Sequence, residues 1–121
     1  TRKDIFLKAD KGRLTQVITN LLSNAIKFTD NGVITIDTYG MDKEVIVSIR
    51  DTGSGIDPEI IPKLFSKFIT KSDRGTGLGL FISKSIIESH GGRIWAENNQ
   101  FGPGATFYFS LPTANSDLDR H

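Results

Sequence analysis

Residues 14–28 read LTQVITNLLSNAIKF, a stretch whose apolar residues recur with the period of an α-helix. Their spacing of i, i+3, i+4 and i+7 places them on one stripe along the helix. They are Leu14, Val17, Ile18, Leu21, Leu22, Ala25 and Ile26. The stripe predicts a helix that begins after residues 10–12, ends near Phe28 and packs one face against a core.

The side of this helix away from the stripe carries Asn20, Asn24 and Lys27. At about 100° per residue, these side chains fall within roughly 60° of one another. One interpretation is a solvated helix face. The other is a site for a phosphate compound, because an amide oxygen suits Mg²⁺ and a lysine can meet phosphate as a point charge. The helix by itself leaves both interpretations open.

The segments around this helix predict the rest of the fold. A short strand is expected before it, and a hairpin, a short helix, a longer helix and a final strand pair after it. Their ranges are 5–9, then 33–39 with 44–50, a start at Pro58, 78–90, and 93–97 with 105–111. Because helices and strands do not alternate regularly, we expect an α+β fold, a two-layer α/β sandwich. Its mixed, mostly antiparallel sheet would carry helices on one face.

Composition and charge exclude several classes of protein. The 121 residues suit one domain, and no run of about 18 apolar residues is present to cross a bilayer. Fifteen basic and fourteen acidic residues give a net charge of +1, so we expect neither nucleic-acid binding nor membrane contact by this domain. The absence of cysteine excludes disulfides and thiolate metal sites.

The two ends of the chain also carry expectations. The sequence opens at Thr1 with neither a start methionine nor a signal peptide, so we expect a piece of a longer protein. Residues 1–112 would form the domain. The polar residues 113–121 would form a disordered tail.

Asp51 continues the more apolar face of its predicted strand, because counting by twos places it with Val47 and Ile49. A buried carboxylate needs hydrogen-bond donors, which a backbone amide or the exocyclic amine of adenine can supply. Gly53 and Gly55 follow at once and let the backbone approach a flat ring closely. The alternative is an Asp-Thr-Gly turn whose carboxylate caps its own loop. Both interpretations stay open.

Residues 75–80, GTGLGL, open the predicted helix at 78–90. Free amides and the positive end of that helix suit an anion such as phosphate. The glycine spacing is GxGxG, which differs from both the dinucleotide-binding GxGxxG and the P-loop motif. A hinge or a turn is the alternative interpretation of such a loop.

Four motifs therefore follow one another along the chain: NLLSNAIKF at 20–28, DTGSGI at 51–56, FSKF at 65–68 and GTGLGL at 75–80. In order and spacing they resemble the N, G1, F and G2 boxes of the histidine-kinase branch of the Bergerat-fold ATPases. That superfamily also includes gyrase-, MutL- and Hsp90-type domains. The likeness covers nearly the whole chain.

The resemblance implies ATP and Mg²⁺ as ligands and gives roles to individual residues. Asn24 would be the Mg²⁺ ligand and Asp51 would bind the adenine amine. Asn20 and Lys27 would lie near the phosphates, and they would share in catalysis with Asn24. Phe28 would lie beside the nucleotide. The residues implied in nucleotide binding are Asn20, Asn24, Lys27, Phe28, Asp51, Gly53, Gly55, Ile56, Phe68, Lys71, Gly75, Thr76, Gly77, Leu78, Gly79 and Leu80.

The lid over the triphosphate would be short in this chain. Only six residues separate Phe68 from Gly75, where many family members carry a longer segment. Lys67, Lys71 and Arg74 are near enough in sequence to reach phosphates, and solvated loop charges are the other interpretation.

Asn20 separates the branches of the superfamily. The ATP-hydrolysing members carry a glutamate at this place that activates water, and an amide cannot act as a general base near pH 7. The resemblance therefore implies transfer of the γ-phosphate to a histidine on a separate dimerisation and phosphoacceptor domain. The parent protein would be a cytoplasmic homodimer, and a response regulator would be an indirect partner. Without that domain the chain would not autophosphorylate. The alternatives are a Bergerat-type ATPase or serine kinase, and a nucleotide-binding docking module without transfer activity.

His90 ends the predicted helix just before Gly91 and Gly92. An imidazole at this place can interact with the terminal carbonyls of the helix. We therefore expect a structural role for His90, since the family's phosphoacceptor lies on the other domain.

Overall fold

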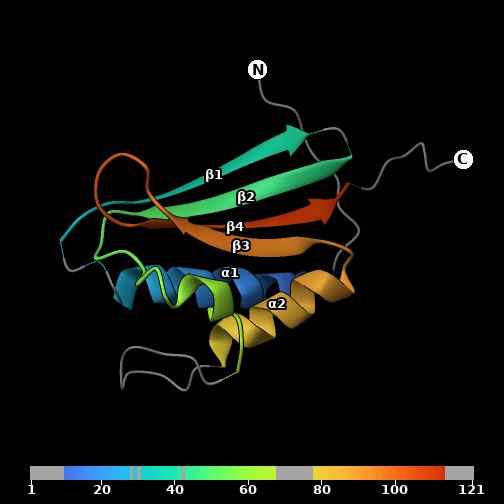
Figure 1. Ribbon diagram of the computed structural model, residues 1–121. Helices are drawn as coiled ribbons and strands as arrows, with labels where there is room; N and C mark the ends of the chain where they lie inside the picture. The colour runs from blue at the N-terminus through green and yellow to red at the C-terminus, as the bar shows by residue number, and fades with distance from the viewer. Residues whose placement is uncertain (1–9, 28, 30, 42, 68–77, 114–121) are drawn as a thin grey trace, which may run out of the picture.

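The computed structural model describes residues 10–27, 29, 31–41, 43–67 and 78–113. Within these residues it contains two α-helices, one short 3-10 helix and four strands. They are α1 (Lys11–Lys27), β1 (Ile34–Met41), β2 (Glu44–Asp51), η1 (Ile61–Lys63), α2 (Gly79–Ser89), β3 (Arg93–Asn98) and β4 (Ala105–Pro112). The sheet forms one layer, and α1 and α2 lie together against one of its faces (Figure 1). The predicted α+β sandwich is confirmed.

The four strands lie in the order β1-β2-β4-β3. Every pairing among the described strands is antiparallel, so the expected hairpin between β1 and β2 and the final pair of β3 and β4 are both confirmed. The strand expected at 5–9 lies outside the described residues. So do residues 114–121, while the Thr113 N–H still donates to the Lys43 carbonyl at 2.9 Å.

Helix α1 forms where its apolar stripe predicts, except that Ile26 at the end of the stripe is 63% exposed and does not join the core. Asp10 caps its start, since its side-chain Oδ1 accepts from the Arg13 N–H at 3.1 Å and its carbonyl accepts from the Leu14 N–H at 2.8 Å. Val17 and Leu21 are completely buried. They belong to a core that joins both helices to the sheet, whose buried members are Val17, Leu21, Ala25, Val45, Ile49, Leu64, Ile86, Ile87, Phe107, Phe109 and Leu111.

The short helix expected to start at Pro58 is wrong in its start and its type. Asp57 folds the chain back first, because its carboxylate accepts from the Glu59 N–H at 2.9 Å and its carbonyl accepts from the Ile60 N–H at 2.8 Å. Such an aspartate turn competes with helix formation. Only one 3-10 turn follows, Ile61–Lys63, with a proline in its first positions.

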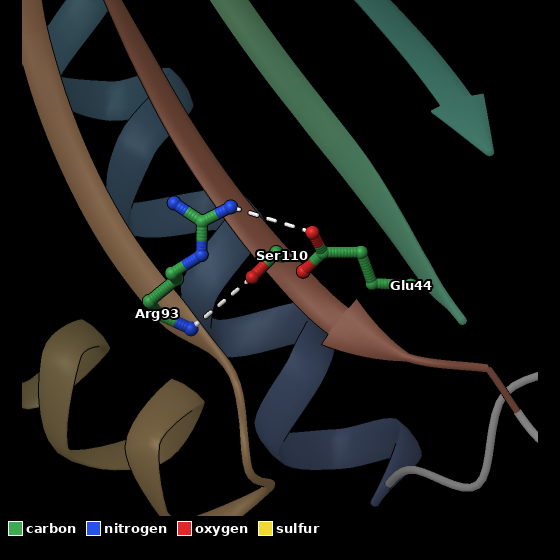
Figure 2. A network of polar contacts seen from close by, with 3 residues as sticks. All are labelled: Glu44, Arg93 and Ser110. Atoms are coloured by element: carbon green, nitrogen blue, oxygen red, sulfur yellow. Dashed lines mark hydrogen bonds and ion pairs between the residues drawn. The ribbon is translucent and has the colours of Figure 1, made fainter. Parts of the chain in front are cut away.

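The face of the sheet away from the helices is tied together by side chains that cross the strands. Arg93 on β3 reaches over β4 to the Glu44 carboxylate on β2, with 3.3 Å between Nη2 and Oε2 (Figure 2). The backbone N–H of Arg93 also donates to the Ser110 hydroxyl at 3.3 Å. Because both charged side chains remain partly solvated, we regard this ion pair as a brace between strands with little effect on stability.

Aromatic rings continue this brace along the same face. The rings of Trp95 and Tyr108 stack with their centres 5.1 Å apart, and the Arg93 guanidinium lies 4.4 Å from the centre of the Trp95 ring. Partial burial, followed by the negative charge of Glu97, raises the pKa of the Tyr108 hydroxyl above its usual value of 10.0. The face therefore has a layer of large side chains of its own.

No helix in the described part of the chain is long and apolar enough to cross a membrane.

Candidate nucleotide-binding site

Asp51 is the last residue of β2 and is only 4% exposed. Its Oδ1 atom accepts hydrogen bonds from the backbone N–H of Gly53 at 2.9 Å and of Ala105 at 3.3 Å. Both hydrogen bonds that the described residues give this carboxylate go to the same oxygen. One half of the carboxylate thus caps its own turn, as one interpretation of the sequence proposed, and the other half can still accept a donor from a ligand.

The turn after Asp51 contains the predicted site residues Gly53, Gly55 and Ile56. Ile56 is held by Asn98 at the end of β3, whose side-chain Oδ1 accepts from the Ile56 N–H at 2.7 Å and whose Nδ2 donates to the Ile56 carbonyl at 2.8 Å. The turn is therefore fixed at its far end by a side chain from another strand.

Asn98 and its neighbour Asn99 were not among the residues predicted from the sequence. They lie 42 and 48 positions from their partners Ile56 and Asp51. Two asparagines before a glycine-rich loop indicate a turn and nothing more specific. The only signal that pointed toward them is the antiparallel pairing of β3 with β4, which brings the end of one strand beside the beginning of the other.

Asn20 on α1 faces the first turn of α2. Its Nδ2 donates to the Gly79 carbonyl at 3.3 Å and to the Ser83 hydroxyl at 3.2 Å, and Ser83 is completely buried. These bonds bring together two predicted site residues, Asn20 and Gly79, that are 59 positions apart. Because these bonds use the Nδ2 group, the side-chain oxygen Oδ1 of Asn20 is the atom that a ligand would meet.

Asn24 and Lys27 follow Asn20 along α1 and are both half-buried. Lys27 is the basic residue of the last helical turn. The predicted neighbour Phe28 lies outside the described residues.

Helix α2 begins at Gly79 without a side-chain cap and without an acidic residue in its first turn. Leu78 occupies the capping position and Leu80 the second helical position, and both are half-buried. A helix start of this kind presents backbone amides and a positive dipole end. It is the kind of surface to which phosphate binds in many proteins.

The segment between η1 and α2 contains several predicted site residues that lie outside the described residues. They are Phe68, Lys71, Gly75, Thr76 and Gly77. Just before them, the Phe65 ring packs edge-on against Phe107 of the core, with ring centres 6.2 Å apart. The Lys67 Nζ lies 5.2 Å from the centre of the Phe81 ring on α2.

His90 is engaged in structural hydrogen bonds, as expected. Its Nδ1 lies 2.8 Å from the Ile86 carbonyl, and its Nε2 lies 3.0 Å from the Asp10 N–H. A carbonyl only accepts and a backbone N–H only donates, so the proton of the neutral ring is on Nδ1. The ring thereby joins the end of α2 to the start of α1.

The described residues contain no group of three or more histidine, cysteine or acidic side chains that could hold a metal ion.

By fold, the chain is a Bergerat-type α+β sandwich. A family model of "Histidine kinase-, DNA gyrase B-, and HSP90-like ATPase" matches residues 9–115. The chain therefore belongs to this family.

The relatives include sensor proteins and sensor histidine kinases, among them the sensor histidine kinase WalK of Bacillus subtilis. The sensor protein FixL of Bradyrhizobium diazoefficiens is 44% identical over 113 residues, which are 90% of this chain and 22% of FixL. The chain thus spans about a fifth of the length of that relative. It corresponds to the catalytic, ATP-binding domain of such kinases.

Solved structures agree with this placement. The nucleotide-free catalytic domain of the histidine kinase ThkA has a TM-score of 0.82 and 42% identity over 92% of this chain and 74% of that chain. ThkA in complex with the response regulator protein TrrA has a TM-score of 0.78 and 39% identity over 93% and 32% of the two chains. Full-length ShkA in complex with AMPPNP has a TM-score of 0.82 and 34% identity over 93% and 24%.

Proposed function

We propose that this chain binds Mg-ATP and supplies its γ-phosphate to a histidine on a separate phosphoacceptor domain of the parent protein. The observation that carries the proposal is the state of Asp51, a buried carboxylate with Oδ1 held by two backbone amides at the end of a strand. A carboxylate held in this way has a fixed direction in which it can accept one more hydrogen bond. AMPPNP is an ATP analogue, and its complex with ShkA, a chain similar to this one, supports the choice of ligand.

Asp51 would recognise the base. Its Oδ2 would accept from the exocyclic amine of adenine, and a purine with a carbonyl at that position would face it with an acceptor instead. An acceptor opposite a carboxylate leaves both groups without a donor. Sites of this kind therefore discriminate strongly between a purine with an exocyclic amine and one with a carbonyl.

The phosphates would lie between α1 and the start of α2. Asn20 already links these two helices through Gly79 and Ser83. The amides and dipole at the start of α2 and the Lys27 ammonium would balance the negative charge of the phosphate groups.

Asn24 would hold the Mg²⁺ that accompanies ATP. An amide oxygen is a hard ligand, and Mg²⁺ usually takes few protein ligands while it retains waters and phosphate oxygens. The amide chemistry of α1 fits this ion. When bound, Mg²⁺ would neutralise charge on the phosphates during transfer.

The reaction would be transfer rather than hydrolysis, because Asn20 has no basic group with which to activate water. An imidazole nitrogen of the acceptor would form a bond to the γ-phosphorus while the bond to the β,γ-bridging oxygen breaks. The electron pair of that bond would leave with ADP. This chain would position the donor, and the acceptor domain of a homodimeric parent would bring the nucleophile.

A response regulator would take part indirectly, by receiving the phosphoryl group from the acceptor domain. The complex of ThkA with TrrA supports this partner class.

The test mixes this chain with the phosphoacceptor domain of its parent and with ATP labelled at the γ-phosphate. We expect acid-labile, alkali-stable label on the acceptor domain, and no such label when the acceptor histidine is replaced by glutamine. Release of free phosphate over many cycles per minute without any acceptor would contradict the proposal and favour an ATPase. Tight ATP binding without label on the acceptor would instead favour a docking module.

A further inference from the structure

The loop between β3 and β4 holds both ends of the turn that carries Asp51. Asn98 holds Ile56 at the far end of the turn through two hydrogen bonds. Asn99 holds the near end, because its Nδ2 donates to the Asp51 backbone carbonyl at 2.9 Å. Two neighbouring side chains thus span the whole DTGSGI segment.

Asn99 uses both polar groups of its side chain and its backbone N–H. Besides its bond to Asp51, its Nδ2 donates to the Pro103 carbonyl at 2.8 Å, and its Oδ1 accepts from the Thr106 hydroxyl at 2.6 Å. Its backbone N–H donates to the Gly104 carbonyl at 2.9 Å. Because its donor and acceptor groups are bonded, the Asn99 side chain is held in one rotamer. Its bonds to Pro103 and Thr106 close the loop between β3 and β4.

This closed loop determines where the Ala105 N–H points. Ala105 follows Gly104 directly, and its N–H is one of the two donors on Asp51 Oδ1. The other donor, from Gly53, belongs to the turn that Asn98 and Asn99 hold at its ends. Both donors that orient the carboxylate therefore depend on these two asparagines.

We propose that Asn98 and Asn99 are positioning residues that aim Asp51 Oδ2 at the base, and so set the preference for a purine with an exocyclic amine over a 6-oxo purine. This inference rests on the proposed function. Neither asparagine touches the base in this account. They act through the direction of a carboxylate that would otherwise rotate about its last side-chain bond.

Asn99 matters more than Asn98. Its bonds to Asp51 and Thr106 are partly buried, so water replaces them less readily when they are lost, whereas the bonds between Asn98 and Ile56 are exposed. Aspartate at either position keeps the shape and the accepting oxygen but replaces the donating Nδ2 with a second acceptor. At position 99 that acceptor would face the carbonyls of Asp51 and Pro103, and their repulsion would displace the loop between β3 and β4.

The test measures the dissociation constants of this chain for ATP and for inosine triphosphate, which differ at the 6-position of the purine. We expect Asn99→Asp to weaken ATP binding about tenfold and inosine triphosphate binding less than twofold, so that the preference for ATP, taken as the ratio of the two affinities, falls by at least about fivefold. Asn98→Asp should lower the ratio by about threefold. Gln100→Glu places the same charge change at an exposed position of the same loop and should leave the ratio unchanged.

The ratio separates positioning from stability, because a partly unfolded variant loses both nucleotides equally. An unchanged ratio in Asn99→Asp and Asn98→Asp, whether or not both affinities fall, would overturn the inference. Asn98→Asp carries the test if Asn99→Asp does not fold. If the chain without substitutions bound neither nucleotide, or bound both with the same affinity, the proposed function itself would be overturned.

Discussion

The two halves of the candidate site are built in different ways. At the Asp51 corner, backbone amides of Gly53 and Ala105 hold one carboxylate oxygen. On α1, the Asn20 side chain makes bonds of 3.3 and 3.2 Å to α2. The first half is fixed by the path of the chain, and the second by how two helices pack.

This difference indicates a division of labour. Backbone donors cannot turn away, so the base would meet a preformed partner with little entropy left to lose. Side chains on a helix keep several rotamers, which suits phosphates whose position changes during transfer. Substitutions in the rigid half are therefore expected to have larger effects than substitutions in the adaptable half.

The largest effect is expected from Gly104→Ala. Gly104 has φ of 96°, and a Cβ there would overlap the backbone oxygen of Asp51. We expect the free energy of unfolding to fall by about 3 kcal/mol, from backbone strain plus overpacking. Chemical denaturation measures it. Gly102→Ala is the matched control, since Gly102 has φ of 87° with no atom within 4 Å, and should lose only about 1 kcal/mol. Equal losses would show that the Asp51 corner is not tightly closed.

Asp51→Asn should come next, with ATP affinity lowered about 100-fold and the fold retained. The side-chain carbonyl would stay on the amides of Gly53 and Ala105, so the new NH₂ group would face the adenine amine, donor against donor. Calorimetric titration measures the affinity. Asp37→Asn on the exposed part of β1 is the control. Unchanged affinity in Asp51→Asn would remove Asp51 from the site.

Asn24→Ala tests the adaptable half through the metal. We expect ATP affinity to fall about tenfold in the presence of Mg²⁺ and to stay the same when a chelator removes it, because only the metal contact is lost. Titrations with and without Mg²⁺ measure this difference. In Ser23→Ala, on an exposed side of α1, the effect of Mg²⁺ on ATP affinity should be the same as in the chain without substitutions. The same response in Asn24→Ala would contradict the assigned metal contact.

The smallest effect is expected from Asn20→Ala. Losing two long, partly solvated hydrogen bonds to α2 should lower the free energy of unfolding by about 1 kcal/mol and ATP affinity about threefold. Denaturation and titration on the same samples measure both. Gln16→Ala, exposed one turn earlier on α1, should change neither. A loss of ATP affinity as large as that of Asp51→Asn would mean that the two halves are equally rigid.

The sequence predicted the regular elements well because their periodicity is local. Counting by threes and fours located α1, and counting by twos placed Asp51 on the buried face of β2. It placed Asn20 on the side of α1 away from the apolar stripe, but it did not predict the contact of Asn20 with α2.

The rest of the site depends on contacts that sequence spacing does not reveal. Asn98 and Asn99 act on residues of another strand, and nothing in their local sequence distinguishes them from ordinary loop asparagines. The helix expected to start at Pro58 was wrong for a local reason, because the Asp57 carboxylate folds the chain back before a helix can begin. The nucleotide-binding roles of the candidate site residues, including Phe28 and Lys71, stay predictions.

The most direct test of the account is a structure of this chain with Mg²⁺ and AMPPNP. We expect the exocyclic nitrogen of adenine within about 3 Å of Asp51 Oδ2, with the amides of Gly53 and Ala105 still on Oδ1. A base bound elsewhere, or a carboxylate turned away from those two amides, would contradict the claim that the chain carries a preformed adenine site.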